Sequence, residues 1–306
     1  MRYRIFAVAL AATALLSAAC GSKDTGGAIK SSSNTTAAGG SGTTAAGSDL
    51  FSKLPASIQQ AKEVKIGTDA SYAPNEFFKS DGTTIQGMDF DMGQALAQKL
   101  GVKATFTNSQ FDGLIPALTA KRFDMLMSSM TDNKTRQASV DFVDYFTAGT
   151  AILVQKGNPQ KINSLDDLCG KTVGLERGTI QEDAAKEQAA KCKTDGKAEL
   201  KVLSLDKDTD ALQQLKLGRT QADMNDFPVA AYNAETSSNG NDFEVVGQQF
   251  GSGPYGIAIA KDNTQLRDAV QAALKAIIAD GTYDKVLTTW KVTQGALKTA
   301  TVNAGS

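Results

Sequence analysis

The chain has 306 residues, of which 41% are apolar and 21% are charged, and its formal net charge is −1 at pH 7. A chain of this size can bury one or two hydrophobic cores, and its near-neutral charge gives no basis for a nucleic-acid partner. It contains no histidine, which excludes Ser-His and Cys-His nucleophilic catalysis and any metal site built on histidine. No cofactor and no metal are predicted.

The first 19 residues are typical of a secretory signal peptide. Arg2 and Arg4 precede an apolar stretch, Ile5 to Leu16, and small residues then lead to Cys20. The apolar stretch is too short to cross a bilayer comfortably. The pattern resembles a bacterial lipoprotein signal, which predicts that Cys20 is acylated and anchors an exported protein to the outer face of the cytoplasmic membrane. Ser17 departs from the leucine usual in such signals, so an ordinary signal peptide with a chance cysteine is the alternative.

A polar tether is predicted for residues 20–49. Gly21 to Ser48 consists almost entirely of Gly, Ser, Thr and Ala with a few charges, a composition that cannot bury a core. A flexible coil of this length reaches roughly 30 Å, enough for a folded body to turn above a membrane.

The folded part begins with a first set of alternating strands and helices, which predicts parallel βα units. The predicted elements are a strand at 64–68, a helix at 88–100, a strand at 103–107, a helix at 111–120, a strand at 125–127 and a polar helix start at 131–138.

A second set begins after the apolar segment 151–154. It comprises a short helix capped by Ser164, a strand at 172–175, a polar helix after Thr179, a strand at 199–203, a helix at 209–217, a strand at 222–224 and a helix opening at 225–228. The last part returns to the style of the first set, with a strand at 255–260 and a helical stripe between Leu266 and Ile278. We expect residues 293–306 to form a mobile tail.

Hydroxyl groups and one guanidinium follow the strand at 125–127. Ser128 and Ser129 end the strand, and Thr131 and Arg136 come next. Ligands of open α/β sheets bind at the carboxyl ends of strands, and arginine holds a carboxylate with two parallel bonds. The simpler interpretation is a solvated surface arginine after a Ser-Ser turn. The other motifs of the chain are needed to choose between this interpretation and a binding site.

Those motifs are Val64 to Asp69, then Ala70 to Pro74, then Gly87 to Asp91 at the start of an amphipathic helix. Together with the Ser128–Arg136 segment, their order resembles the polar amino-acid family of solute-binding proteins, which deliver substrate to ABC importers. The resemblance covers most of residues 60–292. It implies an α/β, two-lobed periplasmic-binding-protein-like fold of type II, each lobe a mostly parallel sheet flanked by helices. Lobe 1 would span 50–150 plus 251–292 and lobe 2 would span 151–250, with crossings near 147–154 and 246–253.

The resemblance also implies a trap for a zwitterion. Arg136 would clamp the ligand α-carboxylate with the N–H of Thr131, while the oxygens of Ser129, Thr131 and Asp226 would receive the α-ammonium. Asp226 belongs to lobe 2, so the trap closes only when the lobes approach one another. Asp226 is also the predicted N-cap of the following helix, a role that one carboxylate can combine with ligand contact. Thr179, at a helix start, would add N–H donors to carboxylate binding.

The implied side-chain pocket has two aromatic walls and an acid. Tyr72 and Phe111 would sandwich the ligand side chain, with two core aromatics as the alternative. Asp69 would favour a donor such as guanidinium, ammonium or carboxamide, which favours Arg, Lys or Gln. Asn75 and Glu76 lie close enough in sequence to change that balance. Ile180 stands where many relatives carry a hydroxyl or glycine, so it keeps the backbone donor but loses a side-chain hydrogen bond.

Two further cysteines remain once Cys20 is assigned to the lipid. An exported chain meets oxidising conditions, so we predict a disulfide between Cys169 and Cys192. Metal ligation is the alternative, but the chain has no histidine to complete such a site.

The sequence therefore predicts a monomeric, lipid-anchored amino-acid receptor that presents its ligand to a membrane permease and is not an enzyme. Two alternatives remain: a ligand-binding sensor lipoprotein without import, and a dehydratase-like enzyme on the same scaffold that uses an Asp or Glu acid.

Overall fold

The computed structural model describes residues 46–306. The predicted signal peptide, Cys20 and the tether up to residue 45 lie outside the described residues. The end of the predicted tether is corrected, because helix α1 (Ala46–Ser52) already begins within it. The reason is local packing: Leu50 is buried in the same core as residues of helix α3 (Met88–Leu100). None of the helices in this described part is long and apolar enough to cross a bilayer.

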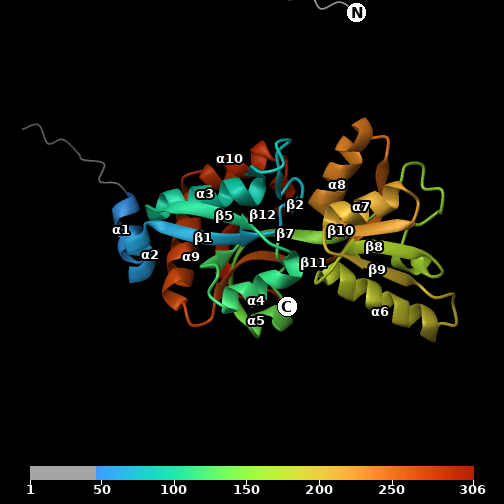
Figure 1. Ribbon diagram of the computed structural model, residues 1–306, viewed down its shortest axis with the longest axis horizontal. Coiled ribbons are helices and arrows are strands. Elements are labelled where there is room, and N and C mark those ends of the chain that lie inside the picture. Colours follow the sequence, from blue (N-terminus) through green and yellow to red (C-terminus); the bar gives the residue numbers. More distant parts are fainter. Residues whose placement is uncertain (1–45) are drawn as a thin grey trace, which may run out of the picture. The chain divides into compact units, whose positions relative to one another are not determined.

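Lobe 1 lies on the left of Figure 1 and contains both ends of the described chain. Its first elements are α1, α2 (Ala56–Ala61), β1 (Glu63–Thr68), β2 (Ser71–Tyr72), β3 (Glu76–Phe78), β4 (Ile85–Gln86), α3, β5 (Lys103–Asn108), η1 (Phe111–Gly113), α4 (Leu114–Thr119), β6 (Met125–Leu126) and α5 (Lys134–Gln137). Its last elements are α9 (Thr264–Ala279), α10 (Thr282–Thr289), η4 (Thr293–Gly295) and β12 (Ala296–Val302).

Lobe 2 lies on the right of Figure 1. It consists of η2 (Leu165–Leu168), β8 (Thr172–Glu176), α6 (Ile180–Thr194), β9 (Lys201–Leu205), α7 (Asp208–Lys216), β10 (Ala222–Asp226), α8 (Phe227–Thr236) and η3 (Ser237–Asn239). The strands and helices predicted for this lobe are confirmed within a few residues at their ends.

Two long strands connect the lobes: β7 (Val140–Gln155) and β11 (Phe243–Ala260). They pair antiparallel along their length, and the register shifts between Val246 and Phe250, and again before Gly253. Each predicted crossing is therefore the middle of a continuous strand. This pairing joins the sheets of both lobes into one nine-stranded sheet, in the order β5-β1-β6-β11-β7-β10-β8-β9 with β12 beside β7.

Within each lobe the outer strands run parallel. In lobe 1, β1 pairs parallel with β5 and β6, and in lobe 2, β8 pairs parallel with β9 and β10. Parallel neighbours bring the carboxyl ends of these strands to one edge in each lobe, and in both lobes that edge faces the other lobe (Figure 1). The functional residues predicted at the strand ends are thereby brought together.

Hydrophobic residues cover both faces of the sheet. Along β7, Ile152 and Val154 pack with α6 in one core, whereas Leu153 packs with α7 and α8 in another. This alternation is what the two-residue period of a strand produces. In Figure 1, α6 accordingly lies on one side of β8 and β10, and α7 and α8 lie on the other. In lobe 1 the larger core packs β1 against α3 and α9, and a smaller one packs α4 on the opposite face.

The predicted mobile tail at 293–306 is corrected by the structure. Residues 296–302 form β12, which pairs antiparallel with β7, and the Gly305 N–H donates to Asp132 Oδ2 at 2.8 Å. Ala300 is buried in the lobe 1 core. Main-chain pairing, side-chain hydrogen bonds such as that from Thr301 to Asp144, and apolar packing together hold this segment in place.

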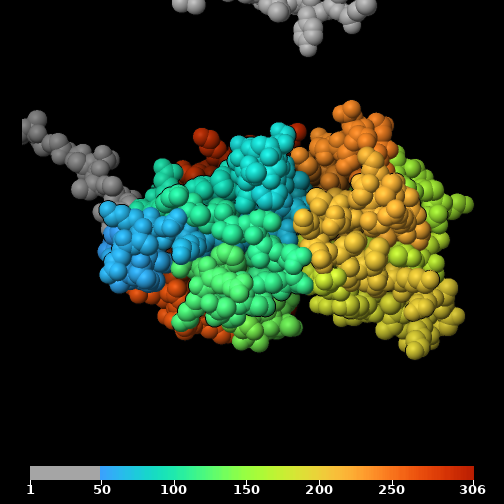
Figure 2. Space-filling view, viewed as in Figure 1, coloured from blue at the N-terminus to red at the C-terminus, as the bar shows by residue number. Residues whose placement is uncertain are grey.

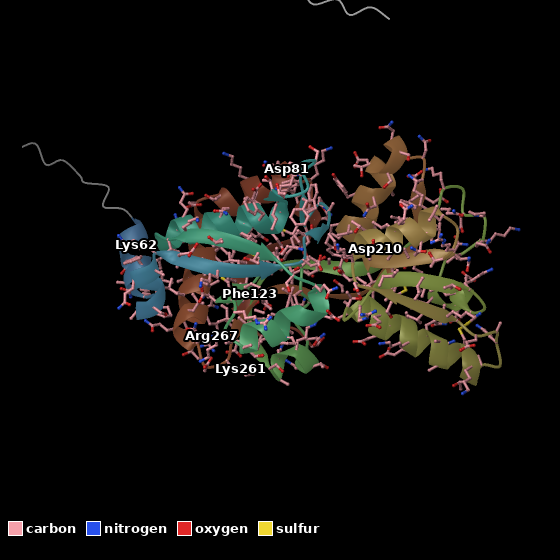
Figure 3. The ribbon with its side chains drawn as sticks, viewed as in Figure 1. Lys62, Asp81, Phe123, Asp210, Lys261 and Arg267 are labelled. Atoms are coloured by element: carbon pink, nitrogen blue, oxygen red, sulfur yellow. A yellow bond between two sulfur atoms is a disulfide. The ribbon has the colours of Figure 1, made fainter. Side chains whose placement is uncertain are left out.

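The predicted disulfide is present. Cys169, directly after η2, is bonded to Cys192 on α6, with 5.6 Å between their Cα atoms (Figure 3). The bond fixes α6 to the connection that precedes β8, at a distance from the strand ends that face lobe 1.

Candidate ligand-binding site

A small cavity lies where the strand ends of the two lobes meet. Figure 2 shows the two lobes in contact with one another. The cavity is lined by Asp69, Tyr72, Glu76, Phe111, Ser128, Ser129, Thr131, Arg136, Glu176, Thr179, Ile180, Gln181 and Asp226. All ten ligand-binding residues predicted from the sequence are among them, and their part in binding stays a prediction.

The lobes touch on several sides of the cavity. The Tyr72 hydroxyl of lobe 1 donates to Asp226 Oδ2 of lobe 2 at 3.1 Å and accepts the Asp226 N–H at 2.9 Å. A Cβ atom at Gly178, where φ is 78°, would stand 2.8 Å from the Cβ of Asp112. The Gly178 position therefore requires glycine for its backbone and for the close approach of the lobes.

Arg136 is positioned by the short helix α5. The Asn133 side chain caps this helix by accepting the Arg136 N–H at 2.9 Å. The guanidinium donates to the Thr131 carbonyl at 2.8 Å and, across the lobe boundary, to the Gly178 carbonyl at 3.1 Å. Its carbon atom lies 5.3 Å from the centre of the Phe111 ring, a cation–π distance. Burial lowers the pKa of Arg136 to about 10, so the side chain remains charged at neutral pH.

Asp226 ends β10 at the N-cap position of α8, but its side chain makes no capping bond. The carboxylate instead accepts from Gln181 Nε2 at 2.9 Å and from the Tyr72 hydroxyl. Burial raises the pKa of Asp226 to about 6, while hydrogen bonds and the charge of Arg136 oppose that rise. The side chain therefore does not cap α8 as predicted, and its carboxylate makes its hydrogen bonds at the cavity instead.

Ser128 and Ser129 are oriented by a buried pair of acids. The hydroxyls of both serines donate to Glu76 at 3.1 Å, and the Ser129 N–H donates to Asp89 Oδ2 at 2.7 Å. Burial and the neighbouring Asp89 raise the pKa of Glu76 well above its usual range. Because the Ser129 hydroxyl proton is used inside the protein, its lone pairs can accept from a donor in the cavity.

Asp69 follows β1 and is fixed by two hydrogen bonds. Its Oδ2 accepts the Phe111 N–H at 3.0 Å, and its own N–H donates to Ser128 Oγ at 2.8 Å. Burial raises the pKa of Asp69. Tyr72 and Phe111, both at least nine-tenths buried, line the cavity beside it, as the sandwich prediction requires.

The N-terminus of α6 completes the wall from lobe 2. The Thr179 hydroxyl accepts the Glu182 N–H at 3.2 Å and donates to the Glu176 carbonyl at 2.7 Å. The first N–H groups of a helix lack partners within it and favour an anion. Ile180 keeps such a backbone donor, and its apolar side chain lines the cavity.

Three lining residues were absent from the predicted set: Glu76, Glu176 and Gln181. Glu176 directly follows the predicted strand at 172–175, so the strand-end rule that was applied to Ser128 and Ser129 could have found it. Gln181 lies in the first turn after Thr179. Glu76 had no positional signal beyond its closeness to Tyr72 in the sequence.

Comparisons with known proteins identify the family of the chain. Residues 64–293 match the model for bacterial extracellular solute-binding proteins, family 3. An arginine-binding protein of Corynebacterium glutamicum is 30% identical over 251 residues, which cover 82% of this chain and 81% of the relative.

Solved structures of an ancestral arginine-binding protein are also similar. The one bound to arginine is 39% identical with a TM-score of 0.69, and the match covers 75% of this chain and 98% of that one. The one bound to glutamine is 38% identical with the same TM-score, covering 76% and 98%. The extent of the family match and of these alignments shows that the chain belongs to family 3 of the bacterial extracellular solute-binding proteins.

Proposed function

We propose that the protein is the substrate-binding component of an ABC importer and captures a polar or basic L-amino acid between its lobes. One observation carries this proposal: Arg136 of lobe 1 and Asp226 of lobe 2 line the same cavity. An amino acid presents an anion and a cation on one carbon atom, so opposite charges from opposite lobes match it. The names of the relatives, which include arginine-binding proteins, support the same class of ligand.

The binding mechanism follows from the donors and acceptors of the cavity. The ligand carboxylate would replace backbone carbonyls as the acceptor for Arg136, with further N–H donors from Thr131 and the start of α6. The ammonium would donate to Asp226, to Ser129 Oγ and to the Thr131 oxygens. The ligand carboxylate and the ligand ammonium would each contact residues of both lobes, so ligand binding favours the closed arrangement of the lobes. The proposed activity is binding and delivery to a permease, without a bond-making step.

We further propose a lipid anchor at Cys20, with the chain acting as a monomer. The support for the anchor is the sequence alone: an apolar stretch from Ile5 to Leu16, then Ser17-Ala18-Ala19 before the cysteine. The polar segment that precedes α1, from Gly21 to Ala45, would let the folded body reach a permease in the same membrane.

A thermal-shift screen of residues 21–306 tests the proposed function without the lipid. All proteinogenic amino acids, ornithine, citrulline and small dicarboxylates would be added well above their expected dissociation constants. A bound ligand raises the melting temperature by mass action. We expect a selective increase with Arg, Lys, ornithine or Gln. An increase only with Glu or Asp would keep the receptor and contradict the role of Asp69, and no increase with any amino acid would contradict the receptor.

We expect the affinity for the amino acid to fall as the pH is lowered through about 6, the raised pKa of Asp226. The ligand ammonium stabilises the ionised carboxylate, so binding releases a proton and is favoured at higher pH. Below the pKa, the affinity should change by up to about tenfold per pH unit. Isothermal titration calorimetry across this range measures the effect. A constant affinity across the same range would contradict the ion pair.

A further inference from the structure

Three carboxyl groups from three separate elements gather at the side of the cavity where Asp69 lies. Asp69 follows β1, Glu176 ends β8 and Asp208 begins α7. Their side chains are buried, with exposed fractions of 4%, 5% and 0%. The Ser71 hydroxyl of lobe 1 accepts the Asp208 N–H of lobe 2 at 3.3 Å, so the group straddles the lobe boundary. Glu176 and Asp69 both line the cavity.

Among the described residues, no cation pairs directly with these three carboxyl groups, although the charge of Lys207 slightly opposes the raised pKa of Asp69. Across residues 46–306, no Lys or Arg side chain forms an ion pair with Asp69, Glu176 or Asp208. In the same part of the chain, Glu176 Oε1 and both carboxyl oxygens of Asp208 have no hydrogen-bond partner.

This arrangement raises the pKa values of the buried carboxyl groups. Burial, followed by the charges of Asp69 and Asp208, raises the pKa of Glu176 well above its usual range, and burial and Asp69 do the same for Asp208. Burying an ionised carboxyl group without a counter-ion is costly, and a cation that pairs with the group lowers that cost. No group of three His, Cys, Asp or Glu side chains in the described part is arranged to hold a metal ion, so the fitting partner is an organic cation.

We propose that Glu176 and Asp69 form a cation subsite that selects an amino acid with a guanidinium side chain, with Asp208 reinforcing its negative field. The proposal rests on the proposed function, because Arg136 and Asp226 must first hold the α-carboxylate and α-ammonium. A guanidinium is planar and carries five donors, so it can contact carboxylates from both lobes at once. A lysine ammonium is a point charge and satisfies fewer of these oxygens in a fixed geometry. A neutral carboxamide supplies no positive charge to stabilise the ionised form of these buried carboxyl groups.

The test compares arginine with citrulline, its neutral analogue of nearly the same shape, by isothermal titration calorimetry on residues 21–306. The wild-type protein should bind arginine at least about 100-fold more tightly than citrulline. Glu176→Gln should weaken arginine about 10-fold to 100-fold, the usual effect of losing a hydrogen bond to a charged group. The same substitution should change citrulline affinity less than about threefold, so the selectivity falls.

Glu187→Gln is the matched control, because Glu187 is exposed on α6 and should leave both affinities unchanged. The melting temperature of Glu176→Gln without added ligand should be unchanged or higher, since the variant loses a buried acid. Equal weakening of arginine and citrulline, or unchanged arginine affinity in a folded variant, would overturn the cation subsite. A wild-type protein that prefers citrulline or glutamine would also overturn it while leaving the receptor intact, whereas no binding of any amino acid would contradict the proposed function itself.

Discussion

Replacing Arg136 with alanine should lower the affinity for the amino acid about 1000-fold or more, which places it beyond measurement in most titrations. A bidentate bond between guanidinium and carboxylate is charge-assisted, and each loss of about 1.4 kcal/mol is tenfold in affinity. The substitution also leaves the ligand carboxylate buried without its counter-ion, which adds to the loss. Isothermal titration calorimetry with the best ligand of the thermal screen gives the result.

The Arg136→Ala protein should remain folded. Arg136 is half-buried, and its partners are the carbonyls of Thr131 and Gly178 at the cavity rather than residues of a hydrophobic core. Arg219→Ala is the matched control, since Arg219 is exposed before β10 and should not affect binding. Arg136→Lys, which keeps the charge but loses the planar fork, should fall between the two. Wild-type affinity in Arg136→Ala would refute the carboxylate clamp.

Local patterns in the sequence predicted the parallel parts of the fold well. Strand β1 and helix α3 have clear apolar periods, and both appear within a residue or two of the predicted ends. The lobe crossings were less visible, because β7 and β11 extend far beyond the short apolar runs at 151–154 and 255–260. Their length comes from pairing with each other across about a hundred residues of sequence, and a local window cannot detect that pairing. Strand β12 was missed for the same reason, because it pairs with β7, which is distant in the sequence.

The same distinction between local sequence patterns and long-range contacts applies to the residues of the candidate site. Ser129 was predictable because it follows a strand, and parallel strands end at a common edge. Asp69 and Asp226 were assigned through the family resemblance. Glu176 also follows a strand, but in the sequence it stands next to Arg177, and such a pair of charged residues is typical of a protein surface. Arg177 is indeed exposed, and it pairs with Asp206 at 2.7 Å. What distinguishes Glu176 is its burial at the cavity, where the charge of Asp69 from the other lobe raises its pKa. That proximity depends on closure of the lobes.

Asp226→Asn should weaken the binding of amino acids about 100-fold and leave their deaminated analogues nearly unaffected. The asparagine has almost the same shape and can still accept from Tyr72 or Gln181, which are the present partners of the carboxylate. It cannot neutralise an ammonium, however, and loss of a buried charged pair costs about 2–5 kcal/mol. Arginine and 5-guanidinopentanoate, which lacks only the ammonium, form the comparison, and titration calorimetry measures both.

The two ligands separate the role of the charge from the role of the shape. In the wild-type protein, 5-guanidinopentanoate leaves Asp226 buried without a cation, so it should bind more weakly than arginine. In Asp226→Asn that cost disappears, and the affinity of the analogue should stay the same or improve while that of arginine falls. Asp206→Asn, at a half-exposed surface ion pair, is the control and should alter neither. If both ligands weakened equally, Asp226 would serve the closed arrangement through Tyr72 and Gln181 rather than the ammonium, and the source of amino-acid selectivity would lie with Ser129 and Thr131.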